Sequence, residues 1–484
     1  MPGTERPFSL PNDHMERTFD SQDASRMCRM GSLAAQAAFL AALPRGLAVT
    51  DPDLLLAVRS DRLVEVEGGV PFALVRARST ADVSAVLRAA SEFGVPVVPR
   101  GAGTGLSGGA SATSGCVVLS LMAMDRILEV DPADAVAVVQ PGVLNALVKR
   151  AAAEHGLSYP PDPSSFEISS IGGNLATNAG GLRCLRGGMT RQSVLGLEVV
   201  LASGEVLRTG GRTVKRRAGY DLLSLFVGSE GTLGVITEAT LRLRPARSAT
   251  ATAVAAFASV SAAADAIGAI MGSPLRVSAL ELMDRVSVRA VEAMRSHGLD
   301  QNAAATLLIE IEDLGPSDLD GLETLCRAAG ASEVAISADA KEQEWLMAAR
   351  RAALPAFERL GTTILDDVIV PRGRIADLLD ATATIARERR TMVGIIGHAG
   401  DGNFHPNFVF DPADPGARAA ALAACDDVMA AAIGLGGSVT GEHGVGSLKR
   451  HFLERELDPT ALATMRALKR LLDPAGILNP GKAI

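Results

Sequence analysis

The spacing of apolar residues predicts a chain in which helices and strands are mixed. Apolar residues at helical intervals predict helices over 82–93 and over 143–155, the second ending at Gly156. Shorter apolar runs predict strands over 95–98, 116–121, 127–130, 135–139 and 234–243. Pro245, which has no backbone N–H to donate, ends the last of these strands. The first half of the chain is therefore expected to form an α+β domain.

The pattern changes after Pro245. Alanine-rich helices alternate with apolar strands over 306–311 and 392–396, which indicates a second domain of the α/β or α+β class. The stretch 249–270 consists largely of Ala, Ser and Thr and contains Asp265, so it is interpreted as a packed helix and not as a membrane span. We expect four parts in the chain. They are an extension over 1–30, a first domain over 31–246, a second domain over 247–435, and a segment over 436–484 that returns to the first domain.

The composition excludes several classes of protein. The chain has 484 residues, 48% of them hydrophobic, so it is expected to be a soluble globular protein with more than one core. A net charge of −8 with one Trp and two Tyr argues against nucleic acid as a partner. Five cysteines without a C-x-x-C pair exclude a disulfide framework, a c-type haem and an iron–sulfur cluster, and they favour a reducing compartment.

The first thirty residues carry charges of both signs and contain no apolar run. They do not form a secretory signal, and they do not resemble a transit peptide, which is basic and poor in acids. We expect a poorly ordered extension.

Three glycine-rich loops predict a site for a large polar ligand. The first, 99–109, contains G-x-G-x-x-G, but no helix follows as a Rossmann site requires, and no Lys-Ser/Thr follows as a P-loop requires. Five glycines within nine residues let several backbone N–H groups face one anion, although taken alone the segment also fits a flexible surface loop. Further loops over 169–181 and 228–237 make a bound dinucleotide the better interpretation.

A pair of histidines indicates a metal site. The turn 399–402 reverses the chain after an apolar strand and brings His398 towards His405. Asn403, His405 and Asn407 share one face of the second strand, and Phe404, Phe408 and Phe410 share the other. A lone histidine on a strand is usually structural, but two that flank a Gly-Asp-Gly turn favour metal binding.

Glu442 in the distant motif 441–444 completes the ligand set. Two imidazoles and one carboxylate are typical of a catalytic metal centre with an open position, for which zinc is the first choice and Mn²⁺ or Fe²⁺ also fit. Adjacent side chains of an extended chain diverge, so Glu442 is expected to bind the metal while His443 faces the substrate. An imidazole is suited to accept a hydroxyl proton at neutral pH; a histidine that only supports the ligands is the alternative.

Together these motifs carry a specific resemblance. The glycine loops, Gly-His-x-Gly-Asp-Gly-Asn-x-His and Gly-Glu-His-Gly resemble the D-2-hydroxyacid dehydrogenase branch of the vanillyl-alcohol oxidase and p-cresol methylhydroxylase flavoprotein superfamily, over about 51–482. That branch includes the D subunit of glycolate oxidase, FAD-linked D-lactate dehydrogenase and D-2-hydroxyglutarate dehydrogenase. The resemblance implies an α+β fold with a two-lobed FAD-binding domain over 31–246 and an α/β-sandwich substrate (cap) domain over 247–435.

The resemblance also implies which residues hold the cofactor. The FAD ligands would be Arg100, Gly101, Ala102, Gly103, Thr104, Gly105, Leu106, Ser107, Pro163, Ser164, Ser165, Asn174, Asn178, Ala179, Gly180, Gly181, Glu230, Gly234, Ile236 and Asn479, the last closing over the cofactor. Members with covalently attached flavin often present a histidine in the first loop, and this chain has none between His14 and His155. We therefore expect non-covalent FAD.

The resemblance implies oxidation of a D-2-hydroxyacid to the 2-oxoacid. Arg350 would grip the substrate carboxylate, and the metal at His398, His405 and Glu442 would bind substrate oxygens with Asn407 assisting. His443 would remove the hydroxyl proton as a hydride passes to flavin N5. Arg351 is expected to be a solvated neighbour.

Two departures from the family bear on the substrate. Hydroxyglutarate-specific relatives place a lysine flanked by tyrosines where this chain has 364–367, and a threonine where it has Leu354. A dicarboxylate is therefore disfavoured unless Arg183 or Arg186 compensates, and glycolate, D-lactate or a longer monocarboxylate fits better.

The alternatives are D-2-hydroxyglutarate dehydrogenase, a non-catalytic FAD-binding subunit, and an alkyl-dihydroxyacetone-phosphate synthase, whose relatives carry a histidine-rich stretch at 440–443. Electrons would leave to a quinone, an electron-transferring flavoprotein or an iron–sulfur subunit. We expect a cytoplasmic protein without a transmembrane segment that reaches the membrane only through such a partner.

Overall fold

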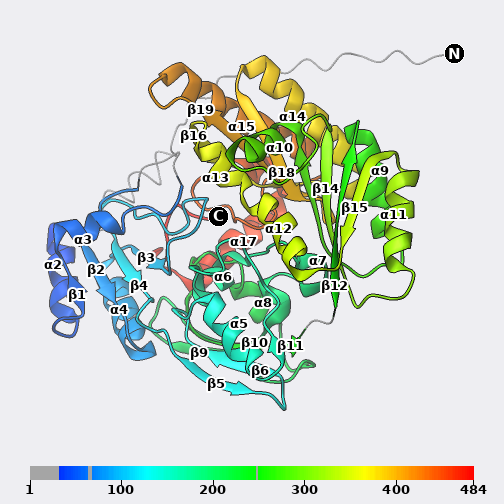
Figure 1. Ribbon diagram of the computed structural model, residues 1–484. Helices are drawn as coiled ribbons and strands as arrows, with labels where there is room; N and C mark the ends of the chain where they lie inside the picture. Colours follow the sequence, from blue (N-terminus) through cyan, green and yellow to red (C-terminus); the bar gives the residue numbers. More distant parts are fainter. Residues whose placement is uncertain (1–31, 64–67, 247–248) are drawn as a thin grey trace.

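The computed structural model describes residues 32–63, 68–246 and 249–484 (Figure 1). The extension expected over 1–30 lies outside these residues. A small sheet opens the described chain, with strand order β1-β2-β4-β3, in which β2, β4 and β3 are parallel and β1 is antiparallel. Its elements are α2 Leu33–Ala42, β1 Ala48–Val49, α3 Pro52–Ala57, β2 Ala73–Arg76, α4 Thr80–Phe93, β3 Val97–Arg100 and β4 Val117–Ser120.

The apolar stripe of α4 explains how this sheet is covered. Val83, Val86 and Leu87 are fully buried against the sheet, and Ser79 caps the helix by accepting from the N–H of Asp82. The helix predicted over 82–93 and the strands predicted over 95–98 and 116–121 are confirmed.

A second, antiparallel sheet has the order β5-β6-β10-β8-β9. Its strands are β5 Ile127–Asp131, β6 Val136–Val139, β8 Val194–Val200, β9 Val206–Gly210 and β10 Val235–Arg242, and it is accompanied by α5 Asn145–Ala153, α6 Ile171–Thr177, η1 Thr190–Ser193 and α8 Leu223–Phe226. The strands predicted over 127–130, 135–139 and 234–243 and the helix predicted over 143–155 are confirmed. Pro245 does not end all pairing, because β11 Arg244–Pro245 continues at an edge against β7 Leu157–Ser158.

The second half of the chain forms one large antiparallel sheet, with the order β15-β12-β14-β13-β18-β19-β16 and β17 paired to β19. Its strands are β12 Thr250–Phe257, β13 Val277–Asp284, β14 Ala305–Glu312, β15 Ala331–Ser337, β16 Thr362–Leu365, β17 Val368–Ile369, β18 Met392–His398 and β19 Asn403–Phe410. Strands β14 and β18 confirm the predictions over 306–311 and 392–396.

Helices cover both faces of this sheet (Figure 1). One face packs against α9 Val260–Met271, α11 Asp318–Ala328, α14 Ile375–Arg389 and α15 Pro415–Gly434. The other packs against α10 Arg285–Met294, α12 Ala340–Arg351 and α13 Ala353–Glu358. Phe404, Phe408 and Phe410 belong to the first core, so the predicted division of β19 into two faces is confirmed.

One predicted helix was wrong in its first half. Residues 250–257 form β12, which pairs with β14 on one side and β15 on the other, and only 260–271 are helical. An uncharged run of small residues has no period that separates a buried strand from a buried helix. Ser259 marks the real start of the helix, because its side chain accepts from the N–H of Ala262.

The last segment contains η3 Arg450–Phe452, α16 Leu453–Glu456 and α17 Pro459–Leu472. It then returns to the first sheet, where Leu478 forms a parallel bridge with Val97 and the N–H of Asn479 donates to the Val97 carbonyl. Among the described residues, no helix combines the length and apolar character needed to span a bilayer. The described cysteines, Cys116, Cys184, Cys326 and Cys425, form no disulfide.

Candidate active site

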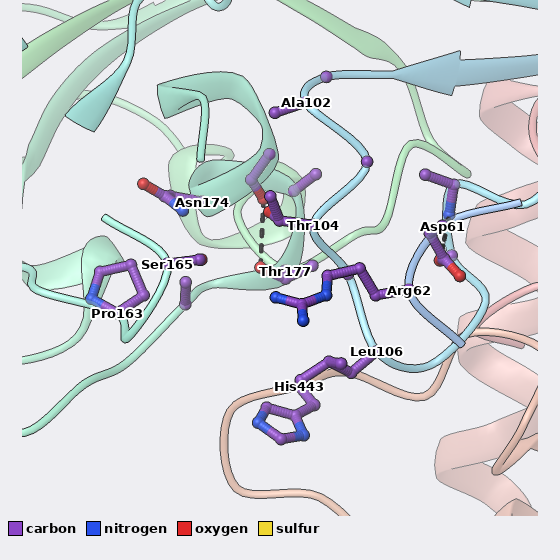
Figure 2. Close-up of a pocket in the computed structure, with 18 of the residues that line it drawn as sticks. Asp61, Arg62, Ala102, Thr104, Leu106, Pro163, Ser165, Asn174, Thr177 and His443 are labelled. Atoms are coloured by element: carbon purple, nitrogen blue, oxygen red, sulfur yellow. Dashed lines mark hydrogen bonds between the residues drawn. The ribbon is translucent and has the colours of Figure 1, made fainter. Parts of the chain in front are cut away.

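A cavity of about 470 Å³ lies between the two halves of the chain (Figure 2). The three glycine-rich loops meet around it, together with residues from α12, α13, β18, β19 and the motif 441–444. Most of the expected FAD ligands line it, namely Arg100, Gly101, Ala102, Gly103, Thr104, Gly105, Leu106, Ser107, Pro163, Ser164, Ser165, Asn174, Ala179, Gly180, Glu230, Gly234 and Ile236.

Three of the expected FAD ligands lie outside this lining. Asn178 ends α6 in the left-handed region and accepts from the N–H of Arg191, and Gly181 packs against the backbone of Asp162. Asn479 donates from Nδ2 to the carbonyls of Gly109 and Glu230, so it ties two loops together behind the cavity. Their direct contact with a cofactor stays a prediction.

Glycine is required in the first loop by close packing. An added Cβ at Gly101 would lie 2.3 Å from Ser170 Oγ, and one at Gly103, where φ is +73°, would lie 2.2 Å from the Arg100 guanidinium. No helix follows β3, so the loop differs from a Rossmann loop as predicted. At these two positions the loop therefore packs too closely against Ser170 and Arg100 to accept a side chain.

Two lining residues lack any sequence signal. The carboxylate of Asp61 accepts from the N–H of Ala110 and the hydroxyl of Ser111, which fixes the end of the first loop. Arg62 extends into the cavity above His443 (Figure 2). Both follow α3 in an ordinary polar turn, which no motif distinguishes from a solvated surface.

The predicted metal ligands do come together. Strands β18 and β19 pair with Ile396 opposite His405, which sets the His398 and His405 rings 5.0 Å apart. The Oε1 atom of Glu442 lies 3.3 Å from His398 Nε2 and 3.5 Å from His405 Nε2. Ligands bound to zinc at 2.0–2.1 Å in a tetrahedron are about 3.4 Å apart. The Glu442 oxygen is thus spaced from each imidazole nitrogen as two ligands of one metal ion are, and all three donor atoms lie within 4.8 Å of one another.

Glu281 was missed by the sequence analysis. Its side chain is fully buried in β13, and its Oε1 lies 2.7 Å from His398 Nδ1. This contact leaves the other ring nitrogen, Nε2, directed at Glu442. The signal available was an acidic residue inside the apolar run 279–283.

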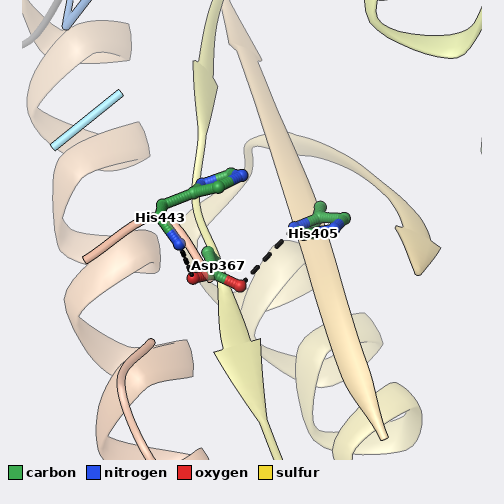
Figure 3. Close-up of side chains that lie close together, drawn as sticks. All are labelled: Asp367, His405 and His443. Carbon is green, nitrogen blue, oxygen red and sulfur yellow. Dashed lines mark hydrogen bonds and ion pairs between the residues drawn. The ribbon is translucent and has the colours of Figure 1, made fainter. Parts of the chain in front are cut away.

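Asp367, also missed, shapes the second motif (Figure 3). Its Oδ2 accepts from the Thr440 hydroxyl and from three consecutive backbone N–H groups, those of 441–443. Its Oδ1 accepts from Asn403 Nδ2 and lies 3.6 Å from His405 Nδ1. Burial would raise the pKa of this carboxyl, but the nearby His443, Lys449 and His405 side chains hold it well below its usual value. The motif is therefore wrapped around an ionised carboxylate.

The conformation of the 441–444 motif corrects the expectation that Glu442 and His443 point in different directions. The backbone around Glu442 is not extended, and the Glu442 and His443 side chains do not diverge. The His443 ring stacks on His405 with centroids 5.0 Å apart, and its Nε2 lies 3.9 Å from Glu442 Oε1. Both Glu442 and His443 line the cavity.

The pKa values of the three predicted metal ligands depend on one another because their side chains are buried together. Burial alone would raise the pKa of Glu442, but the neighbouring histidines hold it at about 2. Burial would lower the pKa of His398, yet Glu281 and Glu442 raise it well above its usual value. For His405, burial and the adjacent His398 lower the pKa well below its usual value. Near neutral pH, Glu442 is ionised and His405 is neutral, as metal ligands must be, whereas His398 holds a proton that a bound metal ion would displace.

Arg350 and Asn407 occupy different positions relative to the cavity. Arg350 is buried, lines the cavity and donates from Nε to Glu281 Oε2 at 2.8 Å. Asn407 is fully buried outside the lining, and its Nδ2 donates to the carbonyl of His405. The substrate contacts expected of both residues stay predictions.

The comparisons with known proteins cover both halves of the chain. A model described as FAD binding domain matches residues 71–210, and one described as FAD linked oxidases, C-terminal domain, matches residues 246–483. Glycolate oxidase subunit GlcD of Bacillus subtilis is 43% identical over 85% of this chain and 89% of the relative. D-lactate dehydrogenase of Archaeoglobus fulgidus is 36% identical over 87% and 93%.

Solved structures share the fold at lower identity. Substrate-bound p-cresol methylhydroxylase aligns with a TM-score of 0.76 at 18% identity, covering 93% of this chain and 96% of that one. Alkyldihydroxyacetonephosphate synthase aligns with a TM-score of 0.71 at 19% identity, covering 93% and 86%. The expected fold class is therefore confirmed, and the chain belongs to the FAD-linked oxidases, as an FAD-dependent oxidoreductase with the p-cresol methylhydroxylase fold.

Proposed function

We propose that this protein oxidises a D-2-hydroxyacid with one carboxylate, such as glycolate, D-lactate or a longer monocarboxylate, to the 2-oxoacid. The names of the relatives, glycolate oxidase subunit and D-lactate dehydrogenase, support this substrate class. The observation that carries the proposal is the convergence of His398, His405 and Glu442 beside His443. Of these four, His405, Glu442 and His443 line the cavity formed by the glycine loops.

The cavity fits FAD as the cofactor. The loops that would hold it present backbone where any side chain larger than glycine at 101 or 103 would clash. When bound, FAD supplies the hydride acceptor, flavin N5, while the protein supplies position and electrostatics. The loops would hold the cofactor without a covalent bond, as expected from the sequence.

The donor set fits a divalent metal ion, with zinc as the first choice and Mn²⁺ or Fe²⁺ as alternatives. When bound at His398, His405 and Glu442, such an ion supplies positive charge beside the substrate oxygen that becomes negative during oxidation. Among the described residues, Asp367, His405 and His443 also lie close enough together to hold an ion. We favour the first set because Oδ2 of Asp367 already accepts four hydrogen bonds and Oδ1 accepts one from Asn403.

Arg350 and His443 would act directly on the substrate. Arg350 uses Nε for Glu281, so its two Nη groups are the ones that would bind the substrate carboxylate as a planar fork. His443 lines the cavity next to the metal ligands, where its imidazole would accept the hydroxyl proton.

The charges around the cavity favour a monocarboxylate. Arg183 is bound by Asp162 and Glu310, and Arg186 by Glu312 and Asp313, so neither fits as the partner of a second substrate carboxylate.

The lining also contains Leu354, Leu365 and Ile396, which suit an apolar substrate chain. Two further arginines of the lining, Arg62 and Arg351, are each paired with a glutamate.

The second half-reaction needs a separate electron acceptor. A quinone, an electron-transferring flavoprotein or an iron–sulfur subunit would serve, and a relative named as a subunit of glycolate oxidase supports an assembly with partners. We propose a cytoplasmic enzyme that reaches the membrane only through such a partner.

An anaerobic substrate panel tests the proposal. Glycolate, D-lactate, L-lactate, D-2-hydroxybutyrate and D-2-hydroxyglutarate are mixed with the purified holoenzyme, flavin bleaching is followed, and bound metal is quantified on the same sample. We expect bleaching by the D-monocarboxylates and about one divalent ion per chain. Bleaching by D-2-hydroxyglutarate alone, or by none of the acids, contradicts the proposal.

His443→Ala tests the role of the base. Flavin reduction by the best substrate should slow by about 10²–10⁴-fold, with FAD and metal retained. His451→Ala is the matched control, because His451 is half exposed and pairs with Asp426 away from the cavity. A His443→Ala variant that reduces flavin as fast as this control would rule out the assignment.

A further inference from the structure

A carboxylate at the centre of the large sheet joins two parts of the site. Glu281 stands between Leu280 and Leu282 in β13, and its side chain has no exposed surface. Burial of a carboxylate is strongly unfavourable unless the group is paired and hydrogen-bonded. Each of its oxygens has one such partner, which are His398 Nδ1 at 2.7 Å from Oε1 and Arg350 Nε at 2.8 Å from Oε2.

The sheet register determines this arrangement. Strands β13 and β18 pair with Glu281 directly opposite His398, so the two side chains point to the same face as neighbours. Arg350 reaches them from the last turn of α12, which covers that face. Three elements therefore meet at one carboxylate.

We propose that Glu281 is a positioning residue that holds the metal ligand His398 and the substrate-binding Arg350 at a fixed separation. The inference rests on the proposed function. In a 2-hydroxyacid the hydroxyl and the carboxylate sit on adjacent carbons, so the groups that bind them must keep a constant spacing. A carboxylate with one oxygen on each group sets that spacing through two short hydrogen bonds, and it also fixes which nitrogen of His398 faces the metal.

Glu310 provides a matched control. It lies in the adjacent strand β14, is almost fully buried, and binds an arginine through both oxygens, as Glu281 binds Arg350 through one. Its partners are Arg183 and Ser278, and it does not line the cavity. Glu310→Gln therefore reproduces the loss of a buried charge without touching the proposed link.

The test measures metal affinity and substrate binding separately. Glu281→Gln cannot accept from both partners, because one oxygen is replaced by an N–H donor. We expect the dissociation constant for zinc, measured by chelator competition, to rise about 10–100-fold. At saturating zinc, the KM for D-lactate should rise about tenfold or more while kcat falls less. Glu310→Gln should change neither quantity beyond twofold.

A second pair of variants gives an answer if Glu281→Gln does not fold. Arg350→Lys keeps the charge but loses the Nε bond, so it should weaken zinc binding severalfold although Arg350 is no metal ligand. Arg327→Lys is the control, because Arg327 in the last turn of α11 also donates from Nε to a glutamate, Glu323, but at the surface; it should leave zinc binding unchanged.

The outcomes separate the two proposals. Wild-type protein that neither retains metal nor bleaches with any hydroxyacid would overturn the proposed function and this inference with it. Wild-type protein that does both, with wild-type zinc affinity in Glu281→Gln and in Arg350→Lys, would overturn only the inference. Equal losses in Glu310→Gln would also overturn it, since the effect would then reflect burial of charge in general.

Discussion

One carboxylate oxygen, Oε1 of Glu442, lies within 4 Å of the Nε2 atoms of His398, His405 and His443. Because three imidazole rings surround this carboxylate, the Glu442 side chain has little room to move. Gly180 completes the enclosure, because an added Cβ there would lie 2.3 Å from the other oxygen, Oε2. The residue next to a ligand can thus be as constrained as the ligand itself.

Gly180→Ala is therefore expected to displace Glu442 and to lower metal affinity by about tenfold or more, an effect of the size seen when a ligand loses its support. The measurement is metal retained after dialysis against a chelator. Gly268→Ala is the control, because Gly268 lies in α9 with open space around its Cβ position and alanine stabilises a helix by about 1 kcal/mol over glycine. Equal metal retention in the two variants would contradict the expectation.

At the scale of single residues, the sequence predicts residues that belong to a distinctive motif. It misses residues whose role depends only on where the fold places them. Two histidines around a Gly-Asp-Gly turn are unusual, and their meeting was predicted correctly. Glu281 and Asp367 belong to no motif, because their importance comes from strand pairing across 117 residues and from a loop 73–76 residues away. An acid within or directly after a buried apolar strand was the only available signal.

A short helix, α7 Cys184–Gly187, links the FAD-binding half to the large sheet. Arg183 at its start binds Glu310 through two nitrogens and Asp162 through a third, and the Glu310 carboxylate is almost fully buried. Arg186 at its end binds Glu312, but its side chain is 43% exposed. The two arginines offer a comparison of a buried and an exposed ion pair on one element.

Arg183→Met should lower the free energy of unfolding by about 3–5 kcal/mol, because it removes the positive charge that pairs with two buried carboxylates, Asp162 and Glu310. Arg186→Met should cost about 0–1 kcal/mol, as surface pairs do. Urea denaturation of both variants followed by circular dichroism measures the difference. Similar costs would mean that α7 does not fix the junction through Arg183.

At the level of elements, periodicity was a good guide wherever polar residues interrupt the apolar ones. The amphipathic α4 and the alternating strands were predicted within a few residues. The stretch 249–270 failed because Thr252, Ala253 and Ala255 in β12 are completely buried, so neither face of the strand required a polar residue. In such a strand, apolar and polar residues do not alternate along the sequence. Its conformation is instead determined by its pairing with β14 and β15.

Across the whole molecule, the FAD-binding loops are closed by residues far along the chain. Asn479 joins the loops at Gly109 and Glu230, and Lys482 donates from Nζ to the carbonyls of Gly108 and Ser111. Lys482 is buried, which lowers the pKa of its ammonium to about 8 despite the attraction of nearby Asp61.

This shift predicts a pH dependence of stability. Between pH 8 and about 10.5 the unfolded chain binds more protons than the folded one, so the free energy of unfolding should rise with pH by roughly 3 kcal/mol through that window. Below pH 8 the cost of burying the ammonium is present in full. Lys482→Met should lack the rise, whereas Lys341→Met, an exposed position on α12, should keep it. Parallel curves for the two variants would contradict the prediction.

The flavin should leave the protein when the loops open. Denaturation in guanidinium followed by ultrafiltration is expected to pass the yellow colour and fluorescence into the filtrate, since the chain has no histidine between His14 and His155 to attach it. Fluorescence that stays on the denatured chain would show a covalent link.

The contacts of Asn479 and Lys482 span 370 and 374 residues. A ribosome that adds about 5–20 residues per second takes roughly 20–70 s to make that stretch. During this time a nascent polypeptide has its first glycine loop outside the exit tunnel but lacks the residues that lock it. Stable flavin binding is therefore expected only after Asn479 and Lys482 have been translated.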